Sequence, residues 1–562
     1  MLRLVECVPN FSEGRDRSVI DAITAEFDKA QGVELVDVDP GEATNRTVVT
    51  VIGEPDAMVE AAFHAIKKAA ELIDMRQHKG AHPRMGATDV CPFVPVSGIT
   101  MEECAELARR LGRRVGEELG IWVYLYDQAA TKEEWRNLAN VRQGEYEGLK
   151  DRVGDPKWKP SFGPAELNER AGATAIGARE FLIAYNINLN TRDKSYASDI
   201  ASNLREHGRV KREGDTHPFY IKGDIVFDKK GNKINIPGIF KHCRAVGWFI
   251  EEYGRAQISI NFTNYKITPP HIVLEEARKQ ALERGLLVTG SEVVGLIPLE
   301  AMLMAGRYYL EKQFKSPGVP EEQIVATAIQ SMGLRDVGSF EPDKKIIEYR
   351  FRKPGRLANL DQRDFADELS SGSPAPGGGS VAALAGALSA ALSAMVSNLT
   401  FNKKGYEEFN EEMKEVGVTG QTIKDFLLQA IDRDTDAFNQ VMAAMRTPEE
   451  EREKALEEAN KQATLVPLEV LRESLAALRI AKVAAEKGNR NTVSDAGVAG
   501  LMGRAGAEGA FYNVMINLKS IKDSDFVTST RKQAEEYLFE VAQLAEQVSA
   551  VVRKELGSSG KN

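Results

Sequence analysis

Two short segments combine side chains that can move protons with residues that shape a binding surface. The first runs from His78 to Gly86, HKGAHPRMG, and places His, Lys and Arg within seven positions. Gly80 and Pro83 both disfavour a helix, so we expect a loop. Such a loop suits an anionic substrate and a general base. A solvated polar loop is the alternative, and a zinc site is weaker because no further ligand pair lies at a helpful spacing.

The second segment is DRDTDAF, residues 432–438, within a stretch of helical periodicity. Asp434 falls on an apolar stripe of that helix, whereas Asp432 and Asp436 fall away from it. The apolar members of the stripe are Leu427, Ile431, Phe438, Val441 and Met445. Burying a charged carboxyl on a core-facing stripe costs free energy unless it is paired, and burial raises its pKa. Carboxyl groups used for proton transfer or nucleophilic attack have such raised pKa values. The alternative is a buried Asp in a salt bridge to another helix, or an Asp at the edge of a bundle.

A glycine turn leads into a helix of small residues at 381–396. Gly377, Gly378 and Gly379 permit close backbone approach to a ligand, and Ser380 is a candidate helix N-cap. The first turn of such a helix can hold a carboxylate or a phosphate. The alternative is a tight turn into a buried helix whose small residues serve close packing.

Composition narrows the class of protein. The 562 residues are 43% hydrophobic and 28% charged, which is ordinary for globular domains, and the net charge of −10 argues against nucleic acid as the main partner. Four cysteines without a C-x-x-C pair exclude a disulfide scaffold. The start of the chain lacks a signal-peptide pattern, and the small-apolar run at 381–396 is too short and too mild to span a bilayer. We therefore expect no membrane partner and a cytoplasmic setting.

The rarest residues divide the chain into two parts. All seven histidines lie at or before His271, all four tryptophans at or before Trp248, and all four cysteines at or before Cys243. The loss of three residue types together indicates a separate carboxy-terminal module. Chemistry in that module must proceed without imidazole.

Hydrophobic periodicity predicts a multidomain chain with two ferredoxin-like α/β subdomains followed by an all-α helical bundle. Strands and helices alternate in the first half, and a similar element order begins again near residue 180. Residues 224–237 look like an inserted, exposed hairpin. Beyond residue 361 only helical runs appear, and we expect five or six helices. The predicted domains are residues 1–178, 179–335 and 361–557, with a linker at 336–360.

These motifs together resemble a known family. VECVPNFSEG, DVDPG, NRTV, RQHKGAHPRMGATDVCPFVPV, VYLYDQA and FLIAYNIN are similar to glutamate formiminotransferase. APGGGSVAA, the stretch 432–438, GN…SD and FYNVMINL are similar to formimidoyltetrahydrofolate cyclodeaminase. Their order resembles that of the bifunctional formimidoyltransferase-cyclodeaminases.

The resemblance implies two linked reactions of histidine breakdown. The first transfers the formimino group from N-formimino-L-glutamate to tetrahydrofolate, and the second cyclises 5-formiminotetrahydrofolate to 5,10-methenyltetrahydrofolate with release of ammonia. The folate, with or without a polyglutamate tail, is the one-carbon carrier and substrate, and no metal is expected. The family also implies a homo-oligomer. One alternative is a glutamate formyltransferase paired with a methenyltetrahydrofolate cyclohydrolase-like domain, and another is a non-catalytic folate-binding scaffold.

The resemblance also implies roles for single residues. His82 is the acid–base group of the transfer, and Asp434 is the nucleophile of the cyclisation. Lys79 and Arg84 are candidates for substrate carboxylates, and Asn10 or Asp39 for the amidinium. Gly86, Gly377, Gly378, Gly379 and Ser380 complete the predicted substrate contacts. The predicted folate loop comprises Gly163, Pro164, Ala165, Glu166, Leu167, Asn168, Glu169, Arg170, Ala171 and Gly172; like the insertion around 211–240, it departs from the mammalian type, here by lacking a Trp.

Overall fold

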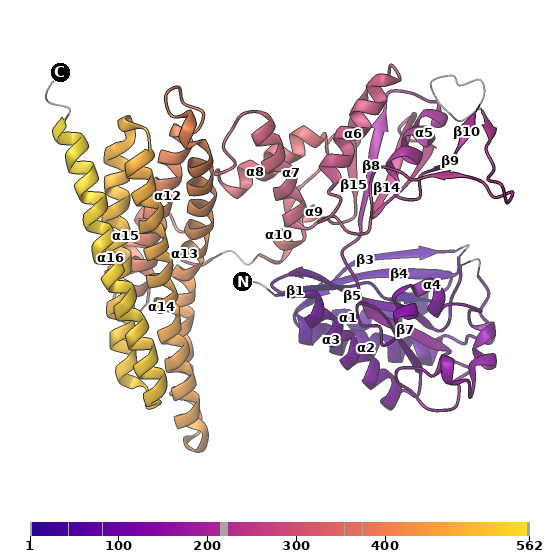
Figure 1. Ribbon diagram of the computed structural model, residues 1–562. Coiled ribbons are helices and arrows are strands. Elements are labelled where there is room, and N and C mark those ends of the chain that lie inside the picture. Colours follow the sequence, from indigo (N-terminus) through magenta and orange to yellow (C-terminus); the bar gives the residue numbers. More distant parts are fainter. Residues whose placement is uncertain are drawn as a thin grey trace. The chain divides into compact units, whose positions relative to one another are not determined.

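The computed structural model describes residues 3–42, 44–80, 82–213, 223–352, 355–373 and 375–558. Residue contacts divide the chain into two compact units, Met1–Ala301 with Gly333–Arg352, and Met302–Met332 with Lys353–Asn562. The first unit contains the sheets and the second is helical (Figure 1). The prediction of an α/β amino-terminal part followed by a largely helical carboxy-terminal part is confirmed. Parts of the predicted insertion around 211–240, of the predicted linker and of the motif loops lie outside the described residues, namely 214–222, 353–354, Ala81 and Pro374.

A seven-stranded mixed sheet forms the first half of unit 1. Strands β1 and β2 follow one another along the same line between β4 and β5, because each pairs with both; β3 pairs with β4, and β7 and β6 extend the other edge in parallel to β5. The strands are β1 (Leu4–Cys7), β2 (Asn10–Phe11), β3 (Val33–Gly41), β4 (Arg46–Gly53), β5 (Thr88–Ser97), β6 (Trp122–Asp127) and β7 (Ala173–Ala178).

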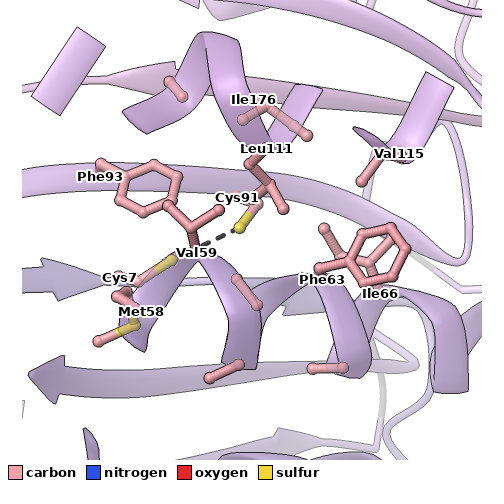
Figure 2. Close-up of a cluster of buried hydrophobic side chains, with 14 of the residues drawn as sticks. Cys7, Met58, Val59, Phe63, Ile66, Cys91, Phe93, Leu111, Val115 and Ile176 are labelled. Atoms are coloured by element: carbon pink, nitrogen blue, oxygen red, sulfur yellow. Dashed lines mark hydrogen bonds between the residues drawn. The ribbon is translucent and has the colours of Figure 1, made fainter. Parts of the chain in front are cut away.

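Three amphipathic helices cover one face of this sheet: α1 (Arg17–Asp28), α2 (Pro55–Leu72) and α3 (Met101–Glu118). A capping box between Thr100 and Glu103 starts α3. Figure 2 shows the core between them, where strand residues such as Phe93 and Ile176 meet side chains of α2 and α3. Cys7 and Cys91 hydrogen-bond across neighbouring strands in this core, with their sulfurs 3.5 Å apart.

The opposite face of the sheet is covered unevenly. Over β6 and β7, an aromatic cluster that includes Trp122, Tyr124 and Trp135 packs under short helices of the segment 133–158. Nearer β3 and β4, this face carries the polar residues Asp39 and Asn10, which flank Val48 in one row across three strands. Residues in such a row share a face, so the predicted site residues of β2 and β3 point to the same side of the sheet.

Strand β7 has no counterpart among the predicted elements. All six of its residues, ATAIGA, are buried, and it pairs with β5 and β6 on its two sides. A buried strand made mainly of small residues lacks the alternation of apolar and polar residues that identifies a strand from sequence.

A second sheet completes unit 1. Its four antiparallel strands are ordered β13–β14–β8–β15, with α5 and α6 beside them. The bounds are β8 (Ile183–Leu189), α5 (Lys194–Leu204), β13 (Cys243–Ile250), β14 (Arg255–Phe262), α6 (Pro270–Glu283) and β15 (Val288–Val294). Between α5 and β13, two short ladders form, β9 (Arg209–Val210) with β12 (Asn235–Ile236) and β10 (Arg212–Glu213) with β11 (Asp224–Ile225).

The helical unit packs long helices around α12 (Gly378–Thr400). Its partners are α13 (Asn410–Ala444), α14 (Glu449–Lys487), α15 (Val493–Asn517) and α16 (Ser524–Ser558), with α8 (Glu321–Met332), most of α7 (Leu299–Lys312) and α11 (Gln362–Leu369). Small residues allow close crossing: a Cβ at Gly506 would lie 2.7 Å from the Gly386 nitrogen. By length and composition α12 is the one described helix that is apolar enough to cross a membrane, but most of its apolar stretch is buried in the unit, as in any core helix.

Residues 302–332 belong with the helical unit by contacts, although the sequence placed them in the second α/β domain. The predicted domain boundaries stay predictions.

Candidate active sites

The His78–Gly86 loop joins α2 to β5 and is held against the turn before β4. The Asn45 side chain donates to the Lys79 carbonyl at 3.1 Å, and His78 Nε2 lies 2.9 Å from the Asn45 carbonyl. Gly80 is required here, because a Cβ at this position would lie 2.1 Å from the Thr44 carbonyl oxygen. The loop is therefore held against the end of the sheet at which β4 begins with Arg46.

His82 is partly buried, and both of its ring nitrogens have partners. Nδ1 lies 2.6 Å from the Pro83 carbonyl oxygen, and Nε2 contacts Nη1 of Arg46. Burial lowers the pKa of His82, and the positive charges of Arg46 and Arg142 lower it further. The imidazole is thereby kept in the neutral form that accepts a proton.

A buried ion pair between Asp89 and Arg142 lies near His82. Asp89 is completely buried and forms an ion pair with Arg142 while accepting from the Met85 backbone N–H at 3.0 Å. The Nε atoms of both Arg46 and Arg142 are buried without a hydrogen-bond partner. Unused guanidinium donors beside a neutral imidazole are typical of a place where an anion binds.

Arg84 is already engaged. It donates to both carboxylate oxygens of Glu147, at 2.8 and 2.6 Å, and to Glu145 at 3.2 Å, while its Nε lies 3.2 Å from His78 Nδ1. A substrate carboxylate would have to replace or join these glutamates, so the predicted role of Arg84 stays a prediction. Lys79 is exposed and, with Arg84, Glu145 and Glu147, lines an open pocket of about 480 Å³.

Asn10 and Asp39 occupy one row of the open sheet face but differ in exposure. Asn10 is buried, its amide N–H donates to the Val8 carbonyl at 2.8 Å, and its Oδ1 has no partner. Asp39 is exposed. Of the two candidates for the amidinium, Asn10 thus offers a free acceptor in a protected position.

The predicted folate loop is tied to the His82 loop at its end. Gly86 and Gly172 form a β-bridge, and a Cβ at Gly86 would lie 2.4 Å from the Ala173 carbonyl oxygen. At its start, Pro164 accepts from the Trp122 indole at 2.9 Å. The tip, including Glu166, is exposed.

In the helical unit, Asp434 of α13 lies against the start of α12. Its Oδ2 accepts from the Ser380 hydroxyl at 3.2 Å, and a Cβ at Gly379 would lie 2.1 Å from its Oδ1. Burial raises the pKa of Asp434, outweighing hydrogen bonds from Ser380 that lower it. Among the residues that the structure describes, Asp434 has no ion pair, so the salt-bridged alternative does not hold.

The neighbouring acids have different surroundings. Asp432 accepts from the backbone N–H groups of Leu357 and Ala358, at 2.7 and 3.2 Å, and Asp436 is exposed. The predicted glycines Gly377 and Gly378 cap and begin α12, with Asn513 of α15 next to Gly378. Thus Asp434 alone of the three acids meets the glycine turn.

Comparisons with known proteins cover nearly the whole chain. Residues 4–179 match the formiminotransferase domain, N-terminal subdomain; residues 184–352 match the formiminotransferase domain; and residues 361–536 match formiminotransferase-cyclodeaminase. A formimidoyltransferase-cyclodeaminase of Dictyostelium discoideum is 43% identical over 96% of each chain.

The chain belongs to the formiminotransferase-cyclodeaminase family.

Relatives of this family also match the two parts separately. A glutamate formimidoyltransferase of Thermoplasma acidophilum is 42% identical over 55% of this chain and 93% of its own. A methenyltetrahydrofolate cyclohydrolase of Methylorubrum extorquens is 39% identical over 34% of this chain and 95% of its own.

The structure of this family member adds residues that sequence reasoning left without a role. Arg46 contacts His82, Asp89 and Arg142 form the buried pair beside it, and Glu147 engages Arg84. Arg46 belongs to the NRTV motif, so a signal existed, but spacing alone cannot pair it with a histidine 36 positions away. Within the described residues, no group of three or more His, Cys, Asp or Glu is arranged to hold a metal ion.

Proposed function

We propose that this chain carries out both reactions of its family. It transfers the formimino group from N-formimino-L-glutamate to tetrahydrofolate, and it cyclises 5-formiminotetrahydrofolate to 5,10-methenyltetrahydrofolate with release of ammonia. The observation that carries the proposal is a partly buried proton-handling group in each unit, His82 and Asp434, each beside the glycine-containing loop of its motif. The family match over almost the full chain supports it.

In the transfer, N5 of the folate attacks the formimino carbon and the glutamate nitrogen leaves. N5 loses a proton and the departing nitrogen gains one, and a neutral imidazole can take the first and return the second. His82 is held neutral, as the first half of this cycle requires. Asn10 Oδ1 is the acceptor proposed for an amidine N–H, and Lys79 and Arg84 are the cations proposed for the carboxylates.

In the cyclisation, the Asp434 carboxylate is the proposed nucleophile: it adds to the formimino carbon, and the formimino nitrogen takes up a proton and leaves as ammonia. N10 then attacks the same carbon, the bond to Asp434 breaks, and N10 gives up its proton. Burial raises the pKa of Asp434, in keeping with a more reactive carboxylate. The helical unit contains no histidine, so proton transfer there proceeds without imidazole, which fits a carboxyl. The α12 N-terminus lies beside this carboxyl, and the Ser380 hydroxyl and backbone N–H bond to it.

We also assign both sheets to the ferredoxin-like class. In each, the first strand of the unit lies between the third and the fourth, and the second lies outside the third: β3–β4–β1/β2–β5 and β13–β14–β8–β15. Helices follow the first and third strands in both. The cytoplasmic setting is proposed from the cysteine composition, which excludes a disulfide scaffold, and the homo-oligomer from the family resemblance.

A second candidate function is favoured by one comparison. Because a methenyltetrahydrofolate cyclohydrolase matches the helical part, the helical unit could instead act on the methenyl compound. Cyclohydrolase activity would consume 5,10-methenyltetrahydrofolate without producing ammonia.

One assay separates these functions. Purified full-length protein is given N-formimino-L-glutamate and tetrahydrofolate, and methenyl absorbance and ammonia are followed together. The proposal expects both to rise in equal amounts, and a formyl donor in place of the formimino donor should give no ammonia. Turnover of the formyl donor alone, or loss of added methenyltetrahydrofolate at a comparable rate, would contradict the proposal.

A further inference from the structure

The hydrogen bonds of His82 determine which of its nitrogens is free of a proton. A carbonyl oxygen only accepts, so Nδ1 carries the hydrogen that bonds to Pro83. A guanidinium only donates, so Nε2 presents its lone pair to Arg46. The lone pair that would take the substrate proton is therefore covered by Arg46.

Arg46 has donor capacity left for a second partner. Its Nε is buried and unpaired, and its pKa is lowered by burial even though Asp89 lies near enough to raise it. A buried guanidinium with an unused N–H gains most by binding a carboxylate, which takes two parallel hydrogen bonds. The proposed donor substrate carries two carboxylates.

We propose that Arg46 is a positioning residue that holds His82 as the neutral Nδ1–H tautomer and, when a carboxylate of the substrate binds it, moves off Nε2 and frees that lone pair for the proton lost by N5. This inference rests on the proposed transfer function. It links binding of the dicarboxylate to the availability of the base, so an empty site keeps its base covered.

The charged groups that face His82 come from three elements. Arg46 lies on β4, Asp89 on β5, and Arg142 directly follows the short helix α4 (Leu138–Val141). The two arginines disfavour imidazolium and Asp89 favours it. Removing Arg46 should therefore raise the pKa of His82, and replacing it by Lys should preserve most of the charge effect while losing the planar fork.

The test compares R46Q, R46K and a control outside the site, R109Q at the partly exposed Arg109 of α3, in the full-length protein. For R46Q we expect kcat/KM for formimino transfer to fall by roughly 10- to 100-fold, with a higher KM for N-formimino-L-glutamate. Its acid limb in the pH profile should move to higher pH, because more alkali is needed to deprotonate His82. R46K should also show the higher KM, with little movement of the acid limb, and R109Q should match wild type. An unchanged circular dichroism spectrum and melting temperature show that each variant is folded, and unchanged ammonia release from supplied 5-formiminotetrahydrofolate shows that the helical unit is unaffected.

A second measurement does not need turnover. With ring-15N-labelled histidines, the His82 resonance is assigned by its absence in H82N, and its pKa is measured with and without L-glutamate as a dicarboxylate probe. In wild type, glutamate should shift the His82 resonance and raise its pKa; in R46Q the pKa should already be raised and respond little. A pKa that is equal in wild type and R46Q would overturn the inference. Absence of transfer in wild type would instead count against the proposed function, and the resonance would still decide the role of Arg46.

Discussion

His82 and Asp434 are both partly buried, and burial moves their pKa values in opposite directions. Burial penalises the charged form of either group, which is imidazolium for His82 and carboxylate for Asp434, so the first pKa falls and the second rises. Their neighbours differ. Two arginines reinforce the effect at His82, whereas at Asp434 the hydrogen bonds from Ser380 oppose it. At the α/β site, burial and two positive charges act together to lower the pKa of the base. At the helical site, burial raises the pKa of the carboxyl, and hydrogen bonds from Ser380 partly offset that rise.

The substitution expected to have the largest effect on activity is His82→Asn. Loss of the imidazole that contacts Arg46 should reduce formimino transfer by roughly 10³-fold, within the usual range for a general base. Ammonia release from supplied 5-formiminotetrahydrofolate should stay at the wild-type rate, because Asp434 lies in the other unit. Stopped assays of both reactions measure this, and a transfer rate within a few-fold of wild type would remove His82 from the mechanism.

Asp434→Asn should have the reverse effect. Cyclisation should fall by roughly 10²- to 10³-fold while transfer continues and 5-formiminotetrahydrofolate accumulates. A carboxyl whose pKa is raised by folding stabilises the fold only where it is protonated, and that contribution is lost as pH rises through the folded pKa. At pH 7 to 8 the melting temperature of the Asn variant should therefore be no lower than wild type. Normal cyclisation, or a clear drop in melting temperature, would contradict the assignment.

Gly379→Ala tests the contact between the glycine turn and the carboxyl. The added Cβ would lie 2.1 Å from Asp434 Oδ1, so the carboxyl must shift, and cyclisation should fall by about 10-fold or more. Gly372→Ala is the matched control, because a Cβ there meets nothing within 4 Å. Equal cyclisation rates in the two variants would show that the position of Asp434 is not critical.

Ser380→Ala should give the smallest effect and the most specific one. The Ser380 hydroxyl lowers the pKa of Asp434, so its loss raises that pKa further and leaves less carboxylate at a given pH. The acid limb of the cyclisation profile should move to higher pH, with a loss of about two- to five-fold at neutral pH. The control is Ser389→Ala. Ser389 lies on α12 like Ser380, and its hydroxyl is equally buried and bonds to the Ala499 carbonyl of α15, so its loss should leave the acid limb in place. Faster cyclisation at neutral pH, with the loss of activity on the alkaline side, would mean that the protonated acid is the active form.

Several features of the fold followed from local patterns. Amphipathic periodicity identified the helices that cover the first sheet, and the absence of strand patterns beyond residue 361 identified the helical unit. Strand β7 escaped notice because a fully buried strand of Ala, Thr, Ile and Gly shows no alternation. Helices α7 and α8 were likewise not anticipated, and their contacts with the helical unit are long-range.

By itself, the sequence determined which proton-handling groups exist and where: imidazole in the first half, a stripe-facing carboxyl in the second, and glycines before each site. Composition and periodicity are local properties, so they can be read without a fold. Only the tertiary structure decided the partners: Arg46 over His82, Glu147 on Arg84, and Gly379 against Asp434. These contacts arise because strand pairing and helix packing bring distant residues together, and the resulting burial and charge set the pKa of each group.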